Sequence, residues 1–442
     1  MAIPGSKSAT ARSLVLSALA DAPGSITGGL VARDTDLMME ALRALGVVIA
    51  TPAPDDPRPA ESIKPSAAPA WRVSPPPEFR PAGRIDCGLA GTVLRFVPPL
   101  AALADGTSHF TGDPAACGRP VAPLLSGLRQ LGAEVVPDGL PFTVRGLATG
   151  RAAVIDSSAS SQFVSGLLLA GARFPEGLDL RHDGGPIPSW PHIEMTVTAL
   201  AARGVTVTTQ SDADRPSARS GDAQAADHDA VASVAHRWQI APGPVRALDE
   251  TIEPDLTTAA VFLAAALVAG GSITVPGWPA QTSQPGARVP EILTRFGGGW
   301  LLDDRGLTLT GDGRLVGGDF DLRETSELTP VVAALATLAS GPTTIRGVGH
   351  IRGHETNRLA ALAGDITALG GRADETADGL VVRPARLAGG RWRSHGDHRL
   401  AHAAALIGLR LPGVEVDDIS VVAKTMPDFA ARWRDILRGG GA

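Results

Sequence analysis

An internal repeat of about 70 residues is the feature of this sequence that most constrains its fold. Six times, an apolar helical run ends in a turn of small residues with glycine and continues as a strand, as in LSALADAPGSIT and LAAALVAGGSITV. Glycine after the last periodic residue is the usual helix stop. The turn glycines are Gly24, Gly106, Gly177, Gly271, Gly341 and Gly413, with separations of 82, 71, 94, 70 and 72 residues. The pattern therefore predicts six similar folding units.

A second helix follows in every unit and also ends at glycine, as in ALRALGVVI and DITALGGRA. Each unit is therefore predicted to contain a helix, a strand, a second helix and further strands. Two of the separations are long because the Pro/Ala-rich segment 51–82 and the polar segment 210–235 are inserted there. Segments of this composition bury little apolar surface, so both are predicted to be surface loops.

Six units in a chain of 442 residues predict two domains of three units each, residues 1–251 and 252–442. If both domains fold alike, the N-termini of their helices converge on one face of each domain, and the two faces enclose a cleft. Helix N-termini carry unsatisfied N–H donors and a partial positive charge. The cleft is therefore predicted to bind anions.

Charge and cysteine content exclude several classes of protein. The formal net charge is −6 at pH 7, whereas a general nucleic-acid binder normally carries a basic surplus. Cys87 and Cys117 are too few for a disulfide framework and lack metal-ligand spacing. The sequence shows no N-terminal signal segment and no apolar stretch of membrane-spanning length. We expect a cytoplasmic protein that binds neither nucleic acid nor a membrane.

The stretch GSKS at residues 5–8 has the residue types of a phosphate site, but it is not a nucleotide P-loop. A P-loop requires G-x-x-x-x-G-K-[ST] after a buried strand, and here Ser6 stands in place of the second glycine. Lysine is rare in this chain, and Lys7 and Lys424 lie at predicted helix starts near its two ends. Because lysine binds phosphate as a compact point charge, these two lysines are candidate site residues.

Cations gather at the predicted helix starts. Serine, threonine and aspartate there are ordinary N-caps, but the helix macrodipole disfavours a cation within one turn of the start. Six cations take such positions, namely Lys7, Arg12, Arg119, Arg358, Arg399 and Lys424. Their placement predicts a compensating anionic ligand. His398 and His402 have a spacing that metal ligands can use, but no third ligand accompanies them, so packing or surface roles are predicted.

Nine stretches of the chain lie in the order and approximate spacing of one known family. They are PGSKSATAR, LAGTVLRF, GRP, SSASSQF, PSWPHIEMT, ELTP, RGHETNRL, GDHRLA and AKTMPDF. With these stretches the chain resembles the EPSP synthases, or 3-phosphoshikimate 1-carboxyvinyltransferases. The resemblance implies an α/β (α+β) fold, a two-domain inside-out α/β barrel with three βαβαββ units per domain and the active site in the inter-domain cleft. It also implies that the first residues cross to the other domain.

The resemblance implies a specific reaction. The 5-hydroxyl of shikimate 3-phosphate would join C2 of phosphoenolpyruvate while C3 gains a proton, and phosphate would leave from the tetrahedral intermediate. Such a transferase serves aromatic amino acid biosynthesis and is a glyphosate target. It would be a monomer with two small-molecule substrates, no metal and no cofactor. The reaction requires a base at the hydroxyl, an acid at the methylene and cations for the phosphate charge.

Matching motif positions imply roles for the site residues. For catalysis they imply Glu327 as the base and Glu355 as the acid, with Lys7 and Lys424 assisting. Shikimate 3-phosphate is expected to contact Lys7, Ser8, Arg12 (at its carboxylate), Ser160, Ser161, Gln162, Ser189, Glu327, His350 and His354. Phosphoenolpyruvate is expected to contact Lys7, Gly91, Thr92, Arg119, Gln162, Arg358, Arg399 and Lys424. Gly91 is expected to allow close backbone approach, and Asp255 and Asp397 to cap helices or orient arginines.

Two alternatives stay open on the sequence. The UDP-N-acetylglucosamine enolpyruvyl transferases share the implied fold and use a cysteine before an Arg-Pro pair, and here Cys117 precedes Arg119. Their opening motif, however, has asparagine after the lysine, where this chain has Ser8. The other alternative is a catalytically inactive anion-binding relative, because Asn357 stands where the family usually has aspartate.

Overall fold

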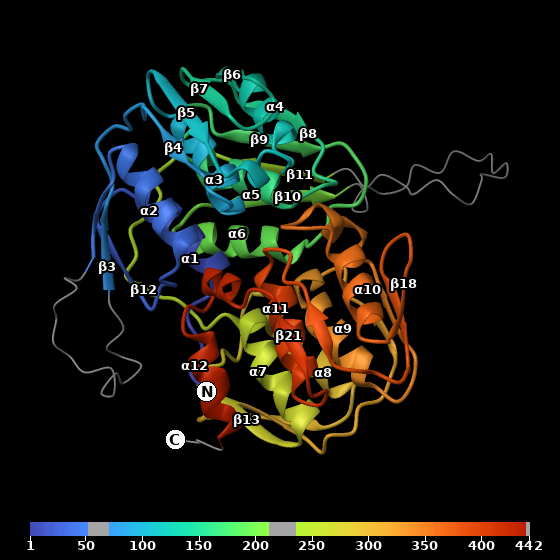
Figure 1. Cartoon of the computed structure of the whole chain (residues 1–442). Coiled ribbons are helices and arrows are strands. Elements are labelled where there is room, and N and C mark those ends of the chain that lie inside the picture. The colour runs from blue at the N-terminus through green and yellow to red at the C-terminus, as the bar shows by residue number, and fades with distance from the viewer. Residues whose placement is uncertain (52–69, 212–235, 439–442) are drawn as a thin grey trace, which may run out of the picture.

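Two lobes make up the protein, blue to green and yellow to red in Figure 1. The computed structural model describes residues 1–51, 70–211 and 236–438. Buried apolar side chains form two separate clusters, one running from Ala11 to Ile252 and the other from Leu256 to Phe429. We call these parts the first and the second lobe, and each has a core of its own. Over the described residues, no helix combines the length and the apolar character needed to cross a membrane.

The first lobe repeats one unit three times. Its elements are α1 (Lys7–Ala18), β1 (Gly24–Thr27), α2 (Arg33–Ala44), β2 (Val48–Ala50), β3 (Ala70–Ser74), β4 (Ile85–Asp86), α3 (Gly91–Ala101), β5 (Thr107–Thr111), α4 (Ala122–Gln130), β6 (Glu134–Val136), β7 (Phe142–Arg145), β8 (Ala152–Ile155), α5 (Gln162–Gly171), β9 (Leu178–His182), α6 (Pro191–Ala202), β10 (Val207–Ser211), β11 (His236–Ile240) and β12 (Glu250–Thr251). They form three sheets in the orders β12-β1-β3-β2, β4-β5-β7-β6 and β10-β11-β9-β8. In each sheet one parallel pair is followed by antiparallel strands.

The second lobe repeats the same plan. Its elements are α7 (Leu256–Ala269), β13 (Gly271–Val275), α8 (Val289–Thr294), β14 (Gly299–Asp303), β15 (Gly306–Gly311), β16 (Asp319–Asp321), α9 (Thr329–Leu338), β17 (Thr343–Arg346), α10 (Arg358–Ala368), β18 (Arg372–Glu375), β19 (Leu380–Arg383), β20 (Gly390–Trp392), α11 (His398–Gly408), β21 (Val414–Val416) and α12 (Phe429–Leu437). The sheets have the orders β13-β15-β14, β16-β17-β19-β18 and β20-β21. Among the described residues, two sheets of the second lobe therefore have fewer strands than the sheets of the first lobe.

The first helix of each unit lies inside its lobe. Almost every residue of α7, α9 and α11 is buried, and α9 packs against both α11 and α7. A helix covered on all sides needs apolar residues all round, which explains the Ala/Val/Leu-rich runs in the sequence. Most polar residues of these helices lie near the N-terminal ends, with Thr337 of α9 as an exception.

Part of segment 51–82 is a strand, contrary to the loop prediction. Ala70–Ser74 forms β3, which pairs with both β1 and β2 in the middle of the first sheet. Trp71 and Val73 are buried and Arg72 is exposed, so the stretch alternates as a half-buried strand should. The strand has only five residues and lies next to a proline-rich sequence, so its alternating pattern was not recognised. The predictions for residues 52–69 and 212–235 lie outside the described residues.

Two stretches of chain cross between the lobes side by side. Gly5 pairs with Pro254 in an antiparallel bridge. The Ser6 N–H donates to the Glu253 carbonyl (2.8 Å), and the Asp255 N–H donates to the Pro4 carbonyl (2.9 Å). Residues before this crossing pack on the second lobe's core. The domain boundary between residues 251 and 252 stays a prediction. Ile252, which it assigns to the second domain, packs in the core of the first lobe.

Candidate active site

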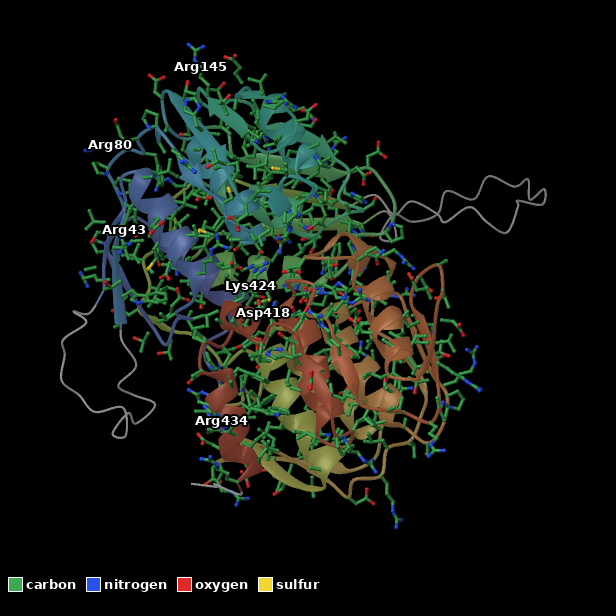
Figure 2. All side chains as sticks on the ribbon, viewed as in Figure 1. Arg43, Arg80, Arg145, Asp418, Lys424 and Arg434 are labelled. Carbon is green, nitrogen blue, oxygen red and sulfur yellow. The ribbon has the colours of Figure 1, made fainter. Side chains whose placement is uncertain are left out.

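One pocket lies between the two lobes, with a volume of about 1120 Å³ including its open mouth. The first helix of every unit brings its N-terminal end to this pocket. The lining residues at or just before those ends are Lys7, Ser8, Gly91, Thr92, Ser161, Gln162, Asp255, Thr257, Glu327, His398 and Arg399. The starts of the second helices add Asp34, Arg119, Pro120, Ser189, His192, Gln284, His354, Glu355 and Lys424. Figure 2 shows Lys424 where the lobes meet.

Most residues assigned from the sequence line this pocket. They are Lys7, Ser8, Gly91, Thr92, Arg119, Ser160, Ser161, Gln162, Ser189, Glu327, His350, His354, Glu355, Arg399 and Lys424. Arg12 and Arg358 do not line it and are buried behind its wall, 3% and 1% exposed. The structure therefore brings both lobes' cations to one place but keeps two of the six away from its surface.

The guanidinium group of Arg12 donates hydrogen bonds to three protein oxygens. Its Nε donates to Thr196 Oγ1 (2.8 Å), Nη1 to the Ser8 carbonyl (2.9 Å) and Nη2 to the His192 carbonyl (2.7 Å). Burial lowers its pKa to about 9. In this arrangement the guanidinium holds α1 against α6, so the predicted contact with the shikimate carboxylate would require these bonds to break.

Arg358 is the centre of a buried charge cluster at the start of α10. Its Nε donates to Asp397 Oδ2 (2.6 Å), Nη1 to Glu327 Oε2 (2.9 Å) and Nη2 to Glu355 Oε2 (2.8 Å). Burial alone would lower the pKa of Arg358, but the three carboxylates raise it well above its usual value. One arginine thus fixes both candidate catalytic carboxylates relative to each other.

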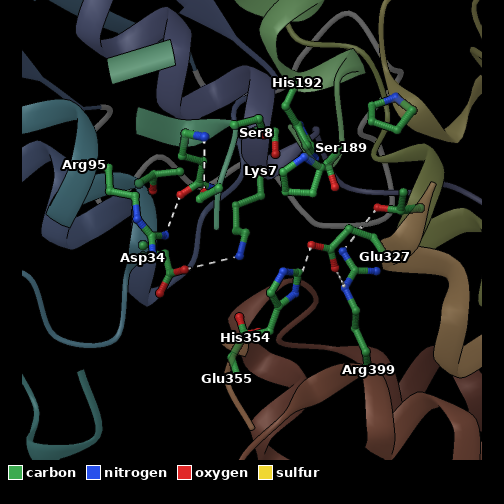
Figure 3. Close-up of a pocket in the computed structure, with 18 of the residues that line it drawn as sticks. Lys7, Ser8, Asp34, Arg95, Ser189, His192, Glu327, His354, Glu355 and Arg399 are labelled. Carbon is green, nitrogen blue, oxygen red and sulfur yellow. Dashed lines mark hydrogen bonds and ion pairs between the residues drawn. The ribbon is translucent and has the colours of Figure 1, made fainter. Parts of the chain in front are cut away.

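Glu327 and Glu355 are both surrounded by cations. Glu327 accepts from Arg358 and lies 2.7 Å from Arg399 Nε, as the close-up in Figure 3 shows for Arg399. Glu355 accepts from Lys424 Nζ at 2.9 Å. Burial opposes ionisation of each carboxyl, but Arg399 and Arg358 hold the pKa of Glu327 well below its usual range. Arg358 and Lys424 do the same for Glu355. Both are therefore carboxylates at neutral pH.

Carboxylates of the protein itself form ion pairs with several of the cations that were predicted to need an anionic ligand. Lys7 pairs with Asp34 at 3.3 Å, and the other pairs are those of Arg358, Arg399 and Lys424 described above. The inference from cations to a ligand was therefore incomplete. Carboxylates from other elements converge on the same helix starts, and their proximity cannot be seen along the sequence.

Two pocket residues were missed by the sequence reasoning. Asp34 is 5% exposed and lies 3.3 Å from Lys7 Nζ and 4.0 Å from Lys424 Nζ, so it links the two lysines across the lobes. At the start of α2 it had the pattern of an ordinary first-turn acid. Arg95 lies one turn into α3 and donates to Gln162 Oε1 at 2.8 Å. Its signal was its place within LAGTVLRF.

Asp255 and Asp397 have the structural roles predicted for them. Asp255 caps α7 by accepting from the Thr258 N–H (2.9 Å), and its other oxygen accepts from the Lys7 N–H (3.1 Å) at the start of α1. Asp397 caps α11 by accepting from the Arg399 N–H (2.9 Å) and also binds Arg358. Both predictions are confirmed. Asp255 additionally joins one helix of each lobe.

Gly91 makes room for guanidinium groups. A Cβ at this position would lie 2.9 Å from Arg119 Nη2 and 3.0 Å from Arg95 Nη1. Arg119 is held at its other side by donation from Nη1 to the Leu89 carbonyl (2.8 Å). The absence of a side chain at Gly91 therefore determines where Arg119 lies in the pocket. This role is separate from the predicted close approach of the ligand to the Gly91 backbone.

His398 and His402 pack inside α11, as predicted. Each is 2% exposed, and the ring of His402 lies against Phe429 with centroids 4.7 Å apart. Burial lowers the pKa of His402 to about 3, so the folded protein keeps this ring neutral through the physiological range.

Stability is expected to fall in mild acid, in part through His402. Between pH 7.5 and 5.5 the unfolded chain protonates this residue and the folded chain does not, so about 1.4 kcal/mol of stability is lost. The contribution is complete above about pH 6.5 and disappears as the pH falls toward the folded pKa. Urea unfolding of His402→Gln should show a smaller loss between these pH values than the wild type. Equal losses would contradict the neutral buried ring.

The comparisons with known proteins identify the family. The sequence model described as EPSP synthase (3-phosphoshikimate 1-carboxyvinyltransferase) matches residues 1–433. This chain belongs to the EPSP synthase family. It is 48% identical to the 3-phosphoshikimate 1-carboxyvinyltransferase of Kocuria rhizophila, over an alignment that covers 100% of this chain and 94% of that protein.

Solved EPSP synthases share the fold. Two structures of EPSP synthase from Acinetobacter baumannii match with a TM-score of 0.73 at 22% sequence identity. The matches cover 100% and 98% of this chain, and 95% and 94% of the matched chains. The predicted family and the predicted two-domain α/β fold are therefore confirmed.

Proposed function

We propose that this protein transfers the enolpyruvyl group of phosphoenolpyruvate to the 5-hydroxyl of shikimate 3-phosphate, with release of phosphate. The observation that carries the proposal is the meeting of Lys7 and Arg119 from the first lobe with Arg399 and Lys424 from the second in one pocket. Membership of the EPSP synthase family supports the same reaction. A di-anionic acid and a phosphorylated ring are ligands that such a pocket can bind.

Phosphoenolpyruvate binds among the cations. Arg119 and Arg399 present planar forks that suit its carboxylate and phosphate. Lys7 and Lys424 reach the same space from opposite lobes as point charges. Their present partners, Asp34 and Glu355, lie at the pocket wall, so a bound di-anion competes with these carboxylates for the lysines. Arg358 acts from behind the wall by fixing the two glutamates.

Shikimate 3-phosphate binds along the hydroxyl-rich wall. Ser8, Ser160, Ser161 and Ser189 offer donors that bind phosphate without adding fixed charge. Gln162 lies beside them, with its side-chain oxygen held by Arg95. Arg12 supports this wall through the Ser8 and His192 carbonyls. His350 and His354 complete the site from the second lobe.

Glu327 is the base and Glu355 the acid. Glu327 is ionised, as a base must be, and it takes the proton of the 5-hydroxyl as the new C–O bond forms at C2. When substrate anions draw Lys424 away from Glu355, the pKa of Glu355 rises, so it takes up a proton from solvent and donates that proton to C3. Phosphate then leaves, stabilised by Lys424 and Lys7, while C3 gives a proton back to the Glu355 carboxylate and the enolpyruvyl double bond forms again.

The two alternatives are not favoured. The family model that matches describes EPSP synthase, and the chain is 48% identical to a protein named 3-phosphoshikimate 1-carboxyvinyltransferase. Both candidate carboxylates and the pocket cations are retained, which speaks against an inactive relative. We further propose a cytoplasmic monomer in aromatic amino acid biosynthesis.

Phosphate release from the purified protein tests the proposal. Release is expected only when shikimate 3-phosphate and phosphoenolpyruvate are both present, and it should stop when either is omitted. Release with a UDP-sugar in place of shikimate 3-phosphate would support the sister activity. Binding of shikimate 3-phosphate without release would support the inactive relative.

Gly91→Ala is expected to weaken phosphoenolpyruvate binding selectively. The added methyl group displaces the Arg119 guanidinium, which costs part of a charged hydrogen bond and raises KM for phosphoenolpyruvate roughly 10-fold. KM for shikimate 3-phosphate should stay close to the wild-type value. Gly83→Ala is the matched control, because a Cβ at Gly83 meets nothing within 4 Å. An unchanged KM for phosphoenolpyruvate would contradict this role.

A further inference from the structure

Three polar side chains form a small hydrogen-bonded group across the two lobes. Ser189, just before α6 in the first lobe, has its Oγ 3.1 Å from Ser326 Oγ in the second. Ser326 Oγ is also 3.0 Å from His350 Nε2, and Ser189 Oγ is 3.4 Å from the same nitrogen. Ser326 therefore contacts one residue of each lobe that the proposed function assigns to shikimate 3-phosphate.

Ser326 differs from its two partners in exposure. Ser189 and His350 line the pocket, whereas Ser326 is 1% exposed and lies behind them in the short helix η6 (Ser326–Leu328). A substrate in the pocket touches the first two and not Ser326. A buried hydroxyl without a partner is costly, so its position between two partners is a strong constraint on both.

The backbone of Ser189 is in a strained conformation, and contacts with the second lobe hold it there. Ser189 has φ +52°, a left-handed conformation uncommon for residues other than glycine. Its N–H donates to the Arg323 carbonyl of the second lobe at 3.3 Å. Such a conformation is unfavourable and persists only where neighbours fix it. Ser189 is therefore anchored to the second lobe by both its backbone and its side chain.

We propose that Ser326 is a positioning residue for the phosphate end of shikimate 3-phosphate. It aligns Ser189 and His350 across the lobes, and this inference rests on the proposed function. The polarity of the group follows from its chemistry. If His350 Nε2–H donates to Ser326 and Ser326 donates to Ser189, the Ser189 proton is left to point at the phosphate. Donors ordered in this way strengthen one another toward an anion.

The neutral state of His350 fits this order. Burial lowers the pKa of His350 to about 4, so the ring carries a single N–H at neutral pH. Placing that hydrogen on Nε2 lets the ring donate to Ser326. The opposite tautomer would turn the Ser326 proton toward the ring, and Ser189 would then no longer receive it.

The test is a double-mutant cycle on the full-length protein. Ser326→Ala removes one hydrogen-bonding hydroxyl and is expected to raise KM for shikimate 3-phosphate about 3- to 10-fold. KM for phosphoenolpyruvate and kcat should each change less than about twofold. Because Ser326 acts through Ser189, adding Ser326→Ala to Ser189→Ala should raise KM by a smaller factor, under about twofold.

Thr325→Val is the matched control. Thr325 Oγ1 is buried beside Ser326 and has no hydrogen-bond partner among the described residues, so removing it should leave both KM values unchanged. Fully additive effects in the cycle, or equal rises in both KM values, would overturn the positioning role. Wild-type turnover is measured first, because its absence would overturn the proposed function instead. Thermal unfolding of each variant separates loss of folding from loss of binding.

Discussion

Glu327→Gln is expected to lower kcat by about 10²- to 10⁴-fold while shikimate 3-phosphate still binds. The amide keeps the shape of the side chain but cannot take the proton of the 5-hydroxyl. In the structure the carboxylate lies between Arg399 and Arg358, at 2.7 and 2.9 Å, so its geometry is fixed and its ionised form is favoured. Steady-state phosphate release at saturating substrates gives kcat, and calorimetric titration gives the affinity for shikimate 3-phosphate.

Glu324→Gln is the matched control for Glu327. Glu324 is an exposed carboxylate of the same segment that pairs with Arg288 at 2.8 Å on the surface. Exposed pairs of this kind contribute little, so this variant should retain wild-type kcat. Retention of full activity by Glu327→Gln, with Glu324→Gln also active, would remove Glu327 from the role of base.

Arg358→Met is expected to destabilise the second lobe by about 3–5 kcal/mol and to abolish turnover. The substitution leaves Glu327, Glu355 and Asp397 close together without the cation they share. For a lobe of this size, the loss corresponds to a fall in Tm of about 6–20 °C. Differential scanning calorimetry measures the shift, and the unfolding transition of the first lobe should move less.

Arg383→Met provides the comparison for Arg358. Arg383 pairs with Asp374 at the surface of the same lobe, where the contact is solvated. Its loss should change stability by no more than about 1 kcal/mol. If Arg358→Met were as stable as Arg383→Met, the buried cluster would not hold the two glutamates in place as described.

The repeat and the helix starts could be predicted from the sequence because each depends on local signals. Turn glycines such as Gly106 and Gly341 end apolar runs, and the chemistry-bearing motifs follow at the next helix. The strand β3 was missed because five alternating residues beside a proline-rich segment carry a weak signal. The crossing at Gly5 and Pro254 could not be predicted, because it depends on contacts between residues that are far apart in the sequence.

The charge balance of the site could not be predicted from the sequence. A cation at a helix start is visible in the motif, but its carboxylate partner comes from another unit, as Asp34 does for Lys424. Burial is not visible in the sequence either: Arg12 is predicted to contact substrate, and in the structure all its guanidinium nitrogens donate to protein oxygens. Ser326 lies outside the matched positions, and only its contacts with Ser189 and His350 reveal it.

A crystal structure of the protein with 5-enolpyruvylshikimate 3-phosphate and inorganic phosphate would show whether cations of both lobes bind the same ligands. We expect the free phosphate to contact Lys7 or Arg119 of the first lobe together with Lys424 or Arg399 of the second. The shikimate phosphate should lie at the serines of the first lobe. Ligands bound wholly within one lobe, with the cations of the other beyond contact distance, would contradict this expectation.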